Sequence, residues 1–581
     1  MFKKLMLTLT ALLIVMSIAS VSAADVNDTS LDVSDVCDDI SDSLISIQED
    51  DVSSSSNSED ASNDEVLATT DTPVLKDSNT TQVATKIIPS TKKTVKGNYL
   101  RVTLKDSAGN TLAKKKIVFK FGSKTYTKKT NSAGVAKLKI KLKAKTYTLK
   151  LSFAGDSSYA KSSKKINFKV TTRTKNKQLK VSATKSINAW IFKYTKSDNN
   201  VILVQNGGKL TFKNGIIIKK GSVSSSNSEN SDFYGTNAAV LVTKKSTLYI
   251  SDSVISTNAN GANAIFVSNL DSSSSGATAY VTNVVINTYK DKSRGLDATY
   301  NGKIIAENVI INTRGGSCAA LATDRGEGTV TATSCTLNTG VGQTSGSGSP
   351  CIYSTGTITA NSCTGTSYVS QIACVEGKNS ITLNNCDLTG YGKGNRYVSG
   401  DYIDSCGIFL YQSMSGDADS GVAKFTATDS TLTLSSASSY FKSAPMFFVT
   451  NTEATIRLEN TDLNFGSGIL LKAAGQSQWG SSGSNGGEVT FKAVSQELTG
   501  KIIIDKISSL KLTLSDSVYT GCINPSSSYG STSVTIGSTS TWKLTGNSHI
   551  TSLSNSGTID YGSYTLYVNG VAYTASNPYS A

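Results

Sequence analysis

The feature that most limits the fold of this chain is an internal repeat that begins near residue 205. Each copy contains a short strand-like segment, an Asn, Asp or Ser, a small residue and a second aliphatic segment, as in residues 249–255. Between residues 252 and 385 the Asn/Asp/Ser position recurs after 31, 25, 26, 28 and 23 residues. The full series is Asn214, Asp252, Asn283, Asn308, Ser334, Ser362, Asn385, Asp429, Asn460, Asp516 and Asn547. A period of this length indicates a solenoid.

A second series of strand-like segments precedes the first by one strand, as at residues 264–267 and 446–449. One coil cannot bury its own apolar residues, but coils stacked about 4.8 Å apart bury them against each other. Thr, Val and Ile are frequent and helix-period segments are lacking, which argues against a leucine-rich repeat. We therefore predict an all-β chain with a right-handed parallel β-helix over residues 205–581 and an irregular C-terminal end. We expect the recurrent Asn side chains to point inward and to hydrogen-bond from coil to coil.

The N-terminus has the order of segments that a secretory signal peptide has. Lys3 and Lys4 precede an apolar run from Leu5 to Ile18, and small residues follow up to Ala23. The run is shorter than the ~20 residues that a membrane-spanning helix needs. We predict a signal peptide at residues 1–23, an extracellular or cell-surface location, and no membrane span after its removal.

Charge divides the N-terminal third of the chain into two regions. Residues 24–77 hold 16 Asp and Glu against one Lys, whereas residues 86–180 hold 27 Lys and Arg against Asp106 and Asp156. Like charge with few apolar residues does not support a packed core. We predict a disordered acidic spacer at residues 24–80, and a screening role toward the basic region remains an alternative.

Residues 81–172 show period-two alternation with Gly, Asn and Asp turns, as in Leu100, Val102 and Leu104. Short strands of this kind in about 90 residues predict a β-sandwich. Residues 131–136 (Asn-Ser-Ala-Gly-Val-Ala) and 153–159 (Phe-Ala-Gly-Asp-Ser-Ser-Tyr) resemble the Ig-like repeats of bacterial and archaeal surface proteins. The resemblance implies a stalk segment. We expect residues 173–204 to form a linker or an N-terminal cap.

The polar strand positions of this basic domain are nearly all Lys. Lysine protects sheet edges from pairing, but the excess of cations goes beyond that need. We expect residues 81–172 to adsorb to an anionic polymer or surface. Nucleic acid is a poorer partner, because the chain is exported and carries no motif that reads bases.

Four stretches of the repeat region carry a wider resemblance. They are residues 294–300 (Arg-Gly-Leu-Asp-Ala-Thr-Tyr), 319–328 (Ala-Ala-Leu-Ala-Thr-Asp-Arg-Gly-Glu-Gly), 348–355 (Gly-Ser-Pro-Cys-Ile-Tyr-Ser-Thr) and 375–380 (Val-Glu-Gly-Lys-Asn-Ser). The region resembles the pectate-lyase-like β-helix class, and in particular the exported adhesin-like proteins of methane-forming archaea and their bacterial relatives. The resemblance implies adhesion at a cell surface, with cell-wall or host glycans and surface proteins as partners.

His549 is the only histidine, and no Cys-x-x-Cys motif accompanies the nine cysteines. We therefore expect no metal site and no cofactor. Seven cysteines, from Cys318 to Cys406, fall at small-residue positions of the two series. Three interpretations remain open for them: buried small fillers, disulfides between adjacent coils, and metal binding.

A polysaccharide lyase or glycoside hydrolase is the main alternative to an adhesin. Such an enzyme needs clustered carboxylates and a basic residue. Candidates are Asp324, Arg325 and Glu327 in one turn, with Asp297, Arg294 and Glu376 on neighbouring coils. A structural role explains the same residues without catalysis: Asp and Gly favour a tight turn, and a stacked salt bridge joins neighbouring coils. A structural envelope protein is a third interpretation of the chain.

Two longer insertions are candidate contact surfaces, because loops that project from a rigid scaffold often carry function. Residues 390–405 contain Tyr391, Arg396, Tyr397 and Tyr402, and residues 473–487 contain Trp479. We expect these side chains to be exposed and to bind glycans or proteins.

Overall fold

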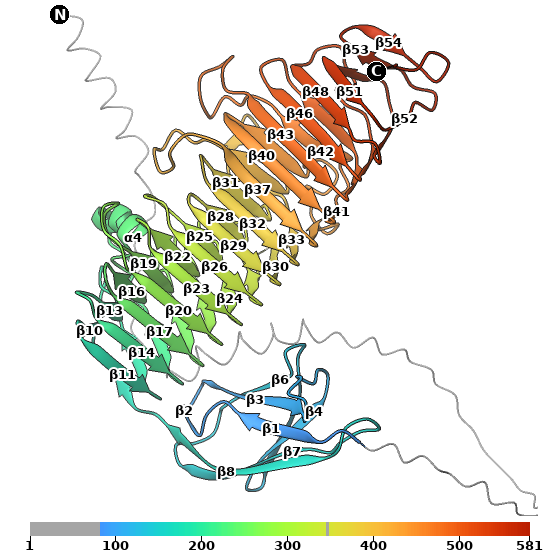
Figure 1. The fold of residues 1–581 in the computed structure, drawn as a ribbon. Helices are drawn as coiled ribbons and strands as arrows, with labels where there is room; N and C mark the ends of the chain where they lie inside the picture. Colours follow the sequence, from blue (N-terminus) through green and yellow to red (C-terminus); the bar gives the residue numbers. More distant parts are fainter. Residues whose placement is uncertain (1–81, 344–347, 581) are drawn as a thin grey trace, which may run out of the picture. The chain divides into compact units, whose positions relative to one another are not determined.

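The computed structural model describes residues 82–343 and 348–580. The predicted signal peptide and acidic spacer therefore lie outside the described residues. Within the described part, the only helical elements are η1 (Ser225–Asn227) and α4 (Ser228–Tyr234), and every other regular element is a strand (Figure 1). The chain is all-β in these residues, as the sequence predicts.

Residues 85–171 form two sheets that enclose one core. Buried Leu100, Val102, Phe119, Leu151 and Phe168 belong to this core, and they come from strands of both sheets. The antiparallel three-stranded sheet contains, in order, β1 (Thr85–Pro89), β3 (Tyr99–Asp106) and β6 (Val135–Lys139). The five-stranded sheet contains, in order, β2 (Lys93–Val95), β8 (Ser162–Thr171), β7 (Thr146–Phe153), β4 (Lys116–Phe121) and β5 (Lys124–Lys129). This two-sheet unit is called the sandwich below.

From residue 174 onward the chain winds into a parallel β-helix with three long sheets (Figure 1). A typical coil passes through sheet 1, then sheet 2, then sheet 3 before the next coil starts. Sheet 1 has 12 strands: β10 (Leu179–Val181), β13 (Ile202–Val204), β16 (Val240–Thr243), β19 (Ile265–Ser268), β22 (Leu296–Thr299), β25 (Leu321–Thr323), β28 (Ile352–Ser354), β31 (Ala373–Glu376), β36 (Ile408–Tyr411), β39 (Phe447–Thr450), β42 (Ile469–Ala473) and β45 (Lys501–Ile504).

Sheets 2 and 3 complete each coil. Sheet 2 has 14 strands: β11 (Thr184–Asn188), β14 (Lys209–Lys213), β17 (Thr247–Ser251), β20 (Thr278–Thr282), β23 (Lys303–Glu307), β26 (Thr329–Thr333), β29 (Thr357–Asn361), β32 (Ser380–Asn384), β37 (Ala423–Thr428), β40 (Thr452–Glu459), β43 (Gly487–Val494), β46 (Ser509–Ser515), β48 (Ser531–Ile536) and β51 (Ser552–Asn555). Sheet 3 has 11 strands: β9 (Thr174–Lys175), β12 (Ile191–Tyr194), β15 (Ile216–Lys219), β18 (Val254–Thr257), β21 (Val285–Thr288), β24 (Ile310–Thr313), β27 (Thr336–Asn338), β30 (Thr364–Ser367), β33 (Asp387–Gly390), β38 (Thr431–Leu434) and β41 (Asp462–Asn464).

The last coils and one insertion add three small sheets. A four-stranded sheet contains β44 (Glu497–Thr499), β47 (Val518–Thr520), β49 (Thr541–Lys543) and β52 (Thr558–Asp560). Near the C-terminus, β50 (Ser548–Ile550) pairs with β53 (Leu566–Val568), and β54 (Val571–Tyr573) pairs antiparallel with β53. The insertion forms a hairpin of β34 (Tyr397–Val398) and β35 (Asp401–Tyr402).

The β-helix begins earlier than the sequence pattern indicates. Residues 173–204, which we expected to be a linker or cap, contain β9 to β12 of the first coil and β13, which starts the second. The reason is that this coil pairs through short strands with few apolar residues, such as β11, in which Ile187 is the only one. The repeat motif becomes visible only where longer apolar strands start.

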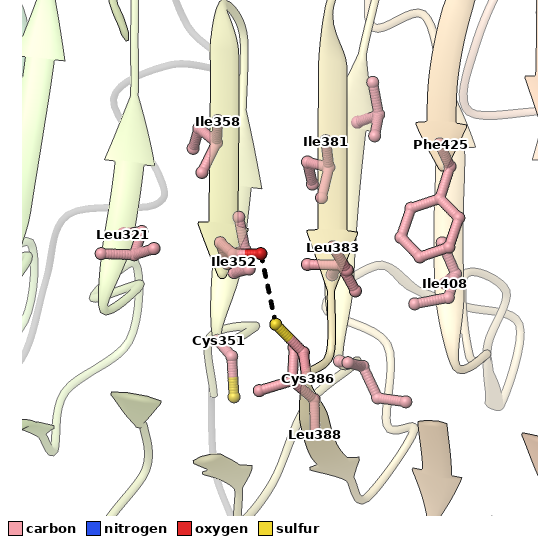
Figure 2. Packing of buried hydrophobic residues seen from close by; sticks show 14 of the residues in the cluster. Leu321, Cys351, Ile352, Ile358, Ile381, Leu383, Cys386, Leu388, Ile408 and Phe425 are labelled. Atoms are coloured by element: carbon pink, nitrogen blue, oxygen red, sulfur yellow. Dashed lines mark hydrogen bonds between the residues drawn. The ribbon is translucent and has the colours of Figure 1, made fainter. Parts of the chain in front are cut away.

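The interior is built from rows of apolar side chains that stack from coil to coil. Ile358 pairs with Ile381, and Ile381 pairs with Phe425, so their side chains form one inward row (Figure 2). Leu321 and Ile352 of sheet 1 form a second row. All five side chains are fully buried. Alternate residues of the same strands point outward, as expected for period-two strands.

The recurrent Asn/Asp/Ser position has a backbone role that we did not expect. Ten of the eleven residues, all except Asn547, follow a strand of sheet 2 with positive φ, for example Asn283 at 57° and Asn385 at 52°. Asn and Asp tolerate this left-handed conformation better than other non-glycine residues. Asn385 is exposed, so the predicted inward orientation is wrong for it, but its amide does donate to Ser362 of the preceding coil over 3.1 Å. The left-handed turn and hydrogen bonds between coils therefore both favour Asn at this position.

A longer amide ladder lies at another position. Asn338 donates to Asn312 over 3.1 Å, and Asn312 donates to Asn287 over 3.2 Å, along sheet 3.

The small residue that follows the left-handed turn is buried, and it is Cys335, Cys363 or Cys386 in three coils. All eight described cysteines are free and buried, and Cys37 lies outside the described residues.

Opposite faces of one strand give a direct test of the register. Ile358→Ala removes a buried side chain from the inward row and should cost about 2–5 kcal/mol of unfolding free energy. Thr359→Ala, one residue further along β29 on the outward face, should cost less than about 1 kcal/mol. Urea unfolding followed by far-UV circular dichroism measures both. Equal losses in the two variants would contradict the assigned register.

Candidate functional site

The outward face of sheet 1 carries a row of mostly apolar side chains, interrupted by one carboxylate. Leu241 pairs with Phe266, and Phe266 pairs with Asp297. The row then continues through Ala322 to Tyr353. Asp297 therefore occupies a position that neighbouring coils fill with buried apolar groups, and it is 0% exposed.

Asp297 belongs to a cluster of three carboxylates around one arginine. The guanidinium of Arg294 lies 2.7 Å from Asp324 and 3.6 Å from Asp297. Asp232, from α4, lies 3.8 Å from the same guanidinium. Asp324 is 3% exposed. We call Asp232, Arg294, Asp297 and Asp324 the acidic cluster.

Burial controls the protonation of this cluster. Burial raises the pKa of Asp297 to about 7 and that of Asp324 to about 6, and Arg294 only partly offsets this effect. Burial also opposes the charge of Arg294, but the three carboxylates outweigh it and raise the pKa of the guanidinium. Neither oxygen of Asp297 accepts a hydrogen bond from the residues that the structure describes. The cluster therefore takes up a proton near neutral pH.

Glu376 lies beside the cluster and is held by two tyrosines. The hydroxyl of Tyr353 donates to Glu376 over 2.5 Å, and the hydroxyl of Tyr411 donates to the same oxygen over 2.8 Å. Burial, with the nearby Glu376, raises the pKa of both tyrosines well above the usual value. The other oxygen of Glu376 accepts no hydrogen bond in the described part of the chain.

α4 and an insertion after β36 cover this region. Arg325 binds Asp417 over 2.8 Å and approaches Glu229 to 3.5 Å. Its guanidinium also lies 3.7 Å from the centre of the Phe233 ring. Thr299 in turn donates to the backbone oxygen of Phe233 over 2.9 Å. The carboxylates are consequently enclosed rather than exposed along a groove.

The structure brings together most of the residues predicted for an enzyme. Arg294, Asp297 and Asp324 are in contact, and Arg325 lies at their edge. Glu327 is the exception among these residues, because it adopts a positive φ of 52° and pairs with Lys378 at the surface over 2.8 Å. The Arg294–Asp324 pair also joins neighbouring coils, as the stacked salt-bridge interpretation requires.

Sequence reasoning missed Asp232, Tyr353, Tyr411 and Asp417. Tyr353 and Tyr411 lie at outward positions of sheet 1, so the strand alternation could have identified them. Asp232 and Asp417 lie in insertions outside the repeat, and no periodic signal placed them near Arg294.

The predicted contact residues have different environments. In the β34–β35 hairpin, Tyr397 is 63% exposed and packs against Tyr402, with ring centres 4.9 Å apart. Arg396 is exposed, and Tyr391 is half-buried against Tyr368. Only part of the group is therefore available to a ligand.

Trp479 does not have the exposed position that we expected. It is 3% exposed, and its ring centre lies 5.4 Å from that of Phe409 and 5.5 Å from that of Tyr411. The outward apolar row of sheet 1 needs a cover at these coils, and the 473–487 insertion supplies Trp479 for it. The expectation of an exposed Trp479 is wrong.

The sandwich has one face lined with lysine. Lys165 of β8 pairs with Lys150 of β7, and Lys150 pairs with Lys120 of β4, which places three cations directly side by side. All three are exposed. The outward residues of the five-stranded sheet that complete this lysine face are Lys93, Lys116, Lys129 and Lys169.

The lysine face holds no Asp or Glu at its outward strand positions. Like charges directly opposite each other in a sheet are destabilising. The arrangement therefore costs stability in the isolated chain, and a polyanion in contact with the face would relieve the repulsion.

No family model, curated protein or solved structure matches the chain. Among the described residues no helix has the length and hydropathy to cross a membrane. In the same residues no group of three or more His, Cys, Asp or Glu has a geometry that could hold a metal ion.

The acidic cluster predicts an unusual dependence of stability on pH. The folded pKa of Asp297, about 7, lies above the unfolded value of about 3.9. Between these values the folded state binds more protons than the unfolded state, so stability should fall as pH rises from about 4 to about 7, by up to about 1.4 kcal/mol per pH unit for this group. Asp297→Asn should flatten the profile of unfolding free energy in urea between pH 4.5 and 8. The exposed Asp401→Asn should leave it unchanged, and equal profiles for all three proteins would contradict the assignment.

Proposed function

We propose that this chain is an exported, adhesin-like protein that binds at a cell surface. In this proposal a basic Ig-like sandwich attaches to an anionic polymer, and a right-handed β-helix presents surfaces for glycans or surface proteins. The lysine face is the observation that carries the proposal. No cofactor is needed for this activity.

The lysines of this face form a continuous row across the sheet. Lys120, Lys150 and Lys165 are neighbours across three strands, with spacings of about 4.8 Å. A row of fixed cations without interspersed carboxylates creates a positive potential that attracts a polymer of repeated negative charge. Ordinary solubility would be served by mixed charges, which avoid the repulsion. An anionic wall polymer is therefore the partner that we assign to this face.

The hairpin of the β-helix adds a second contact surface to the proposal. Tyr397 exposes most of its ring, and Arg396 beside it is also exposed. Aromatic and arginine side chains are enriched at binding hot spots. The 390–405 insertion is thus a candidate for contacts with a glycan or a surface protein.

Carbohydrate cleavage by a lyase or glycoside hydrolase is a second candidate, favoured by one observation. Asp297 and Asp324 share Arg294, and burial raises the pKa of each toward neutrality, which suits general acid–base catalysis. The enclosure by α4 and Arg325 weighs against it, because a polymer would reach these carboxylates only after that cover moves. We therefore rank binding above cleavage.

Replacement of the lysine row tests the proposed attachment. Lys120→Ser, Lys150→Ser and Lys165→Ser together should lower the salt concentration that elutes the protein from immobilised dextran sulfate. The slope of log Kd against log salt should fall by about 2 to 3. A matched triple variant with Lys424, Lys492 and Lys511 of the β-helix changed to Ser loses the same charge elsewhere. Indistinguishable elution of the two triple variants would overturn the role of the lysine face.

A degradation assay separates binding from cleavage. The purified chain incubated with polygalacturonate, cellulose and chitin should produce no new reducing ends and no unsaturated products. If products form, and if Asp324→Asn abolishes them while the surface variant Glu327→Gln retains them, then cleavage replaces binding as the function of the acidic cluster.

A further inference from the structure

The helix α4 is held over sheet 1 mainly by polar contacts. Lys292 donates to Asp232 over 2.9 Å and to Ser228 over 2.9 Å. Thr299 donates to the backbone oxygen of Phe233, which is the buried apolar residue of the helix. Elements with few buried apolar contacts are the ones that open locally in native proteins. Because the strands β16, β19 and β22 pair with one another, α4 can leave them without unfolding the coils.

One residue of this helix belongs to the acidic cluster itself. Asp232 lies 3.8 Å from the guanidinium of Arg294. Asp297 and Asp324 approach the same guanidinium, so three negative charges face one positive charge when all the carboxyls are ionised. Neither oxygen of Asp297 accepts a hydrogen bond in the described part of the chain, and the same is true of the Asp232 oxygen nearest to Arg294. The fully ionised cluster is therefore poorly compensated.

The three carboxylates differ in how firmly the fold holds them. Asp297 lies in β22 and Asp324 follows β25, and both strands pair with the coils on either side. Asp232 lies in a helix that belongs to none of the three sheets. Repulsion within the cluster is therefore relieved most easily by a movement of α4.

Two cations face α4 from the neighbouring coils. Lys292 binds the helix at the rim of the cluster, where the lysine side chain is 45% exposed. Arg325 binds Asp417 and approaches Glu229 of α4, so carboxylates outside the cluster compensate its charge. Neither cation forms an ion pair with Asp297 among the residues that the structure describes.

Three further titratable groups beside the cluster are neutral between pH 5 and pH 8. Burial raises the pKa of Tyr300, which stacks on Tyr234 of α4, to about 12. Burial also raises the pKa of Cys318 to about 12 and that of Tyr353 well above its usual value. Glu376 meets the cluster through Tyr353, whose hydroxyl donates to it. The change of charge in this pH range is therefore centred on the acidic cluster.

We infer that α4 is a pH-controlled cover, which closes over the acidic cluster while the cluster is protonated and opens as Asp297 and Asp324 lose their protons. The ionised carboxylates repel Asp232, the member of the cluster whose element can move. Opening lets water reach all three carboxylates. It also uncovers Phe266, because Gly235 at the end of α4 lies so close to this ring that an added Cβ would fall 2.4 Å from it.

The direction of the pH dependence follows from the protons that each state binds. In the closed state the pKa of Asp297 is about 7 and that of Asp324 is about 6, whereas a hydrated Asp has a pKa of about 3.9. Between these values the closed state binds more protons than the open state, so low pH favours closing. As pH rises from about 4 to about 7, the open population grows by up to about tenfold per pH unit for each carboxyl that titrates.

The cover goes beyond the proposed binding function and does not rest on it. It regulates access to the acidic cluster, whatever molecule reaches that cluster, and it uses none of the residues of the lysine face. Contacts with the cluster should accordingly form more readily above neutral pH than below it.

Hydrogen–deuterium exchange of the purified chain, measured by mass spectrometry, tests the inference. Labelling times at pH 5, 6, 7 and 8 are scaled to the intrinsic exchange rate at each pH. Opening of residues 230–238 should then increase at least about tenfold from pH 5 to pH 8, because two carboxyls titrate in this range. Residues 278–282, which form β20, should stay protected at every pH.

Two variants remove the repulsion in different ways. Asp297→Asn with Asp324→Asn leaves neutral side chains of similar size and should keep α4 equally closed at pH 5 and pH 8. Asp232→Asn changes only the cover and should also reduce the pH dependence. Because Asp232 lies outside the paired coils, this second variant is informative even if the double variant does not fold. Asp401→Asn, on the exposed hairpin, is the matched control and should behave like the parent.

Equal exchange of residues 230–238 in the parent at pH 5 and pH 8 would overturn the cover. The same conclusion follows if the pH dependence persists in the folded double variant. It also follows if β22 exchanges together with α4, because whole coils would then be opening. Elution from dextran sulfate is independent of all these results, so failure of the cover and failure of the proposed attachment are distinguishable.

Discussion

Every feature of the β-helix depends on in-register hydrogen bonding between the backbones of successive coils. Across the described strands of sheet 2 the pairing runs without a shift, and sheet 1 has one irregularity, between Ile469 and Leu471. Because the register is fixed, each sequence position becomes a row along the stack, and a single coil has no independent core. Residue choice at one position of the repeat therefore sets the chemistry of a whole strip, either interior or surface.

The acidic cluster shows the effect of placing one carboxylate in an otherwise apolar row of sheet 1. Asp297 occupies an outward position that Phe266 fills one coil earlier, and both side chains are 0% exposed. Burial within this apolar row is what raises the pKa of the Asp297 carboxyl. Arg294 offsets part of the cost of desolvation, although a buried ion pair by itself adds little stability. The same geometry is compatible with a structural ion pair between coils and with an acid–base pair. Whether a substrate can reach the carboxylates distinguishes the two roles.

Sequence patterns identified the strands and turns of the repeat, but they did not place the residues of the insertions. The period of the Asn/Asp/Ser position predicted the stacked coils, because ten of the eleven recurrent residues make the same left-handed turn. The pattern did not reveal that turn, and it did not show that the amide of Asn385, which donates to Ser362, is exposed, because Asn suits a turn and an interior ladder alike. It also could not place Asp232 or Trp479, because insertions between strands fold back over sheet 1 by tertiary contacts alone. The carboxylates on repeat strands were predictable as candidates, whereas their enclosure was not.

The proposed attachment through Lys120, Lys150 and Lys165 and the proposed contacts of the 390–405 insertion would differ in their physics. Attraction of a polyanion to a row of lysines is long-ranged, and it weakens as salt shortens the Debye length, which is about 8 Å at physiological ionic strength. Contacts of the exposed Tyr397 and Arg396 would act only at van der Waals and hydrogen-bond distances. Weak contacts of both kinds on one chain would reinforce each other, because the first to form raises the effective concentration of the second.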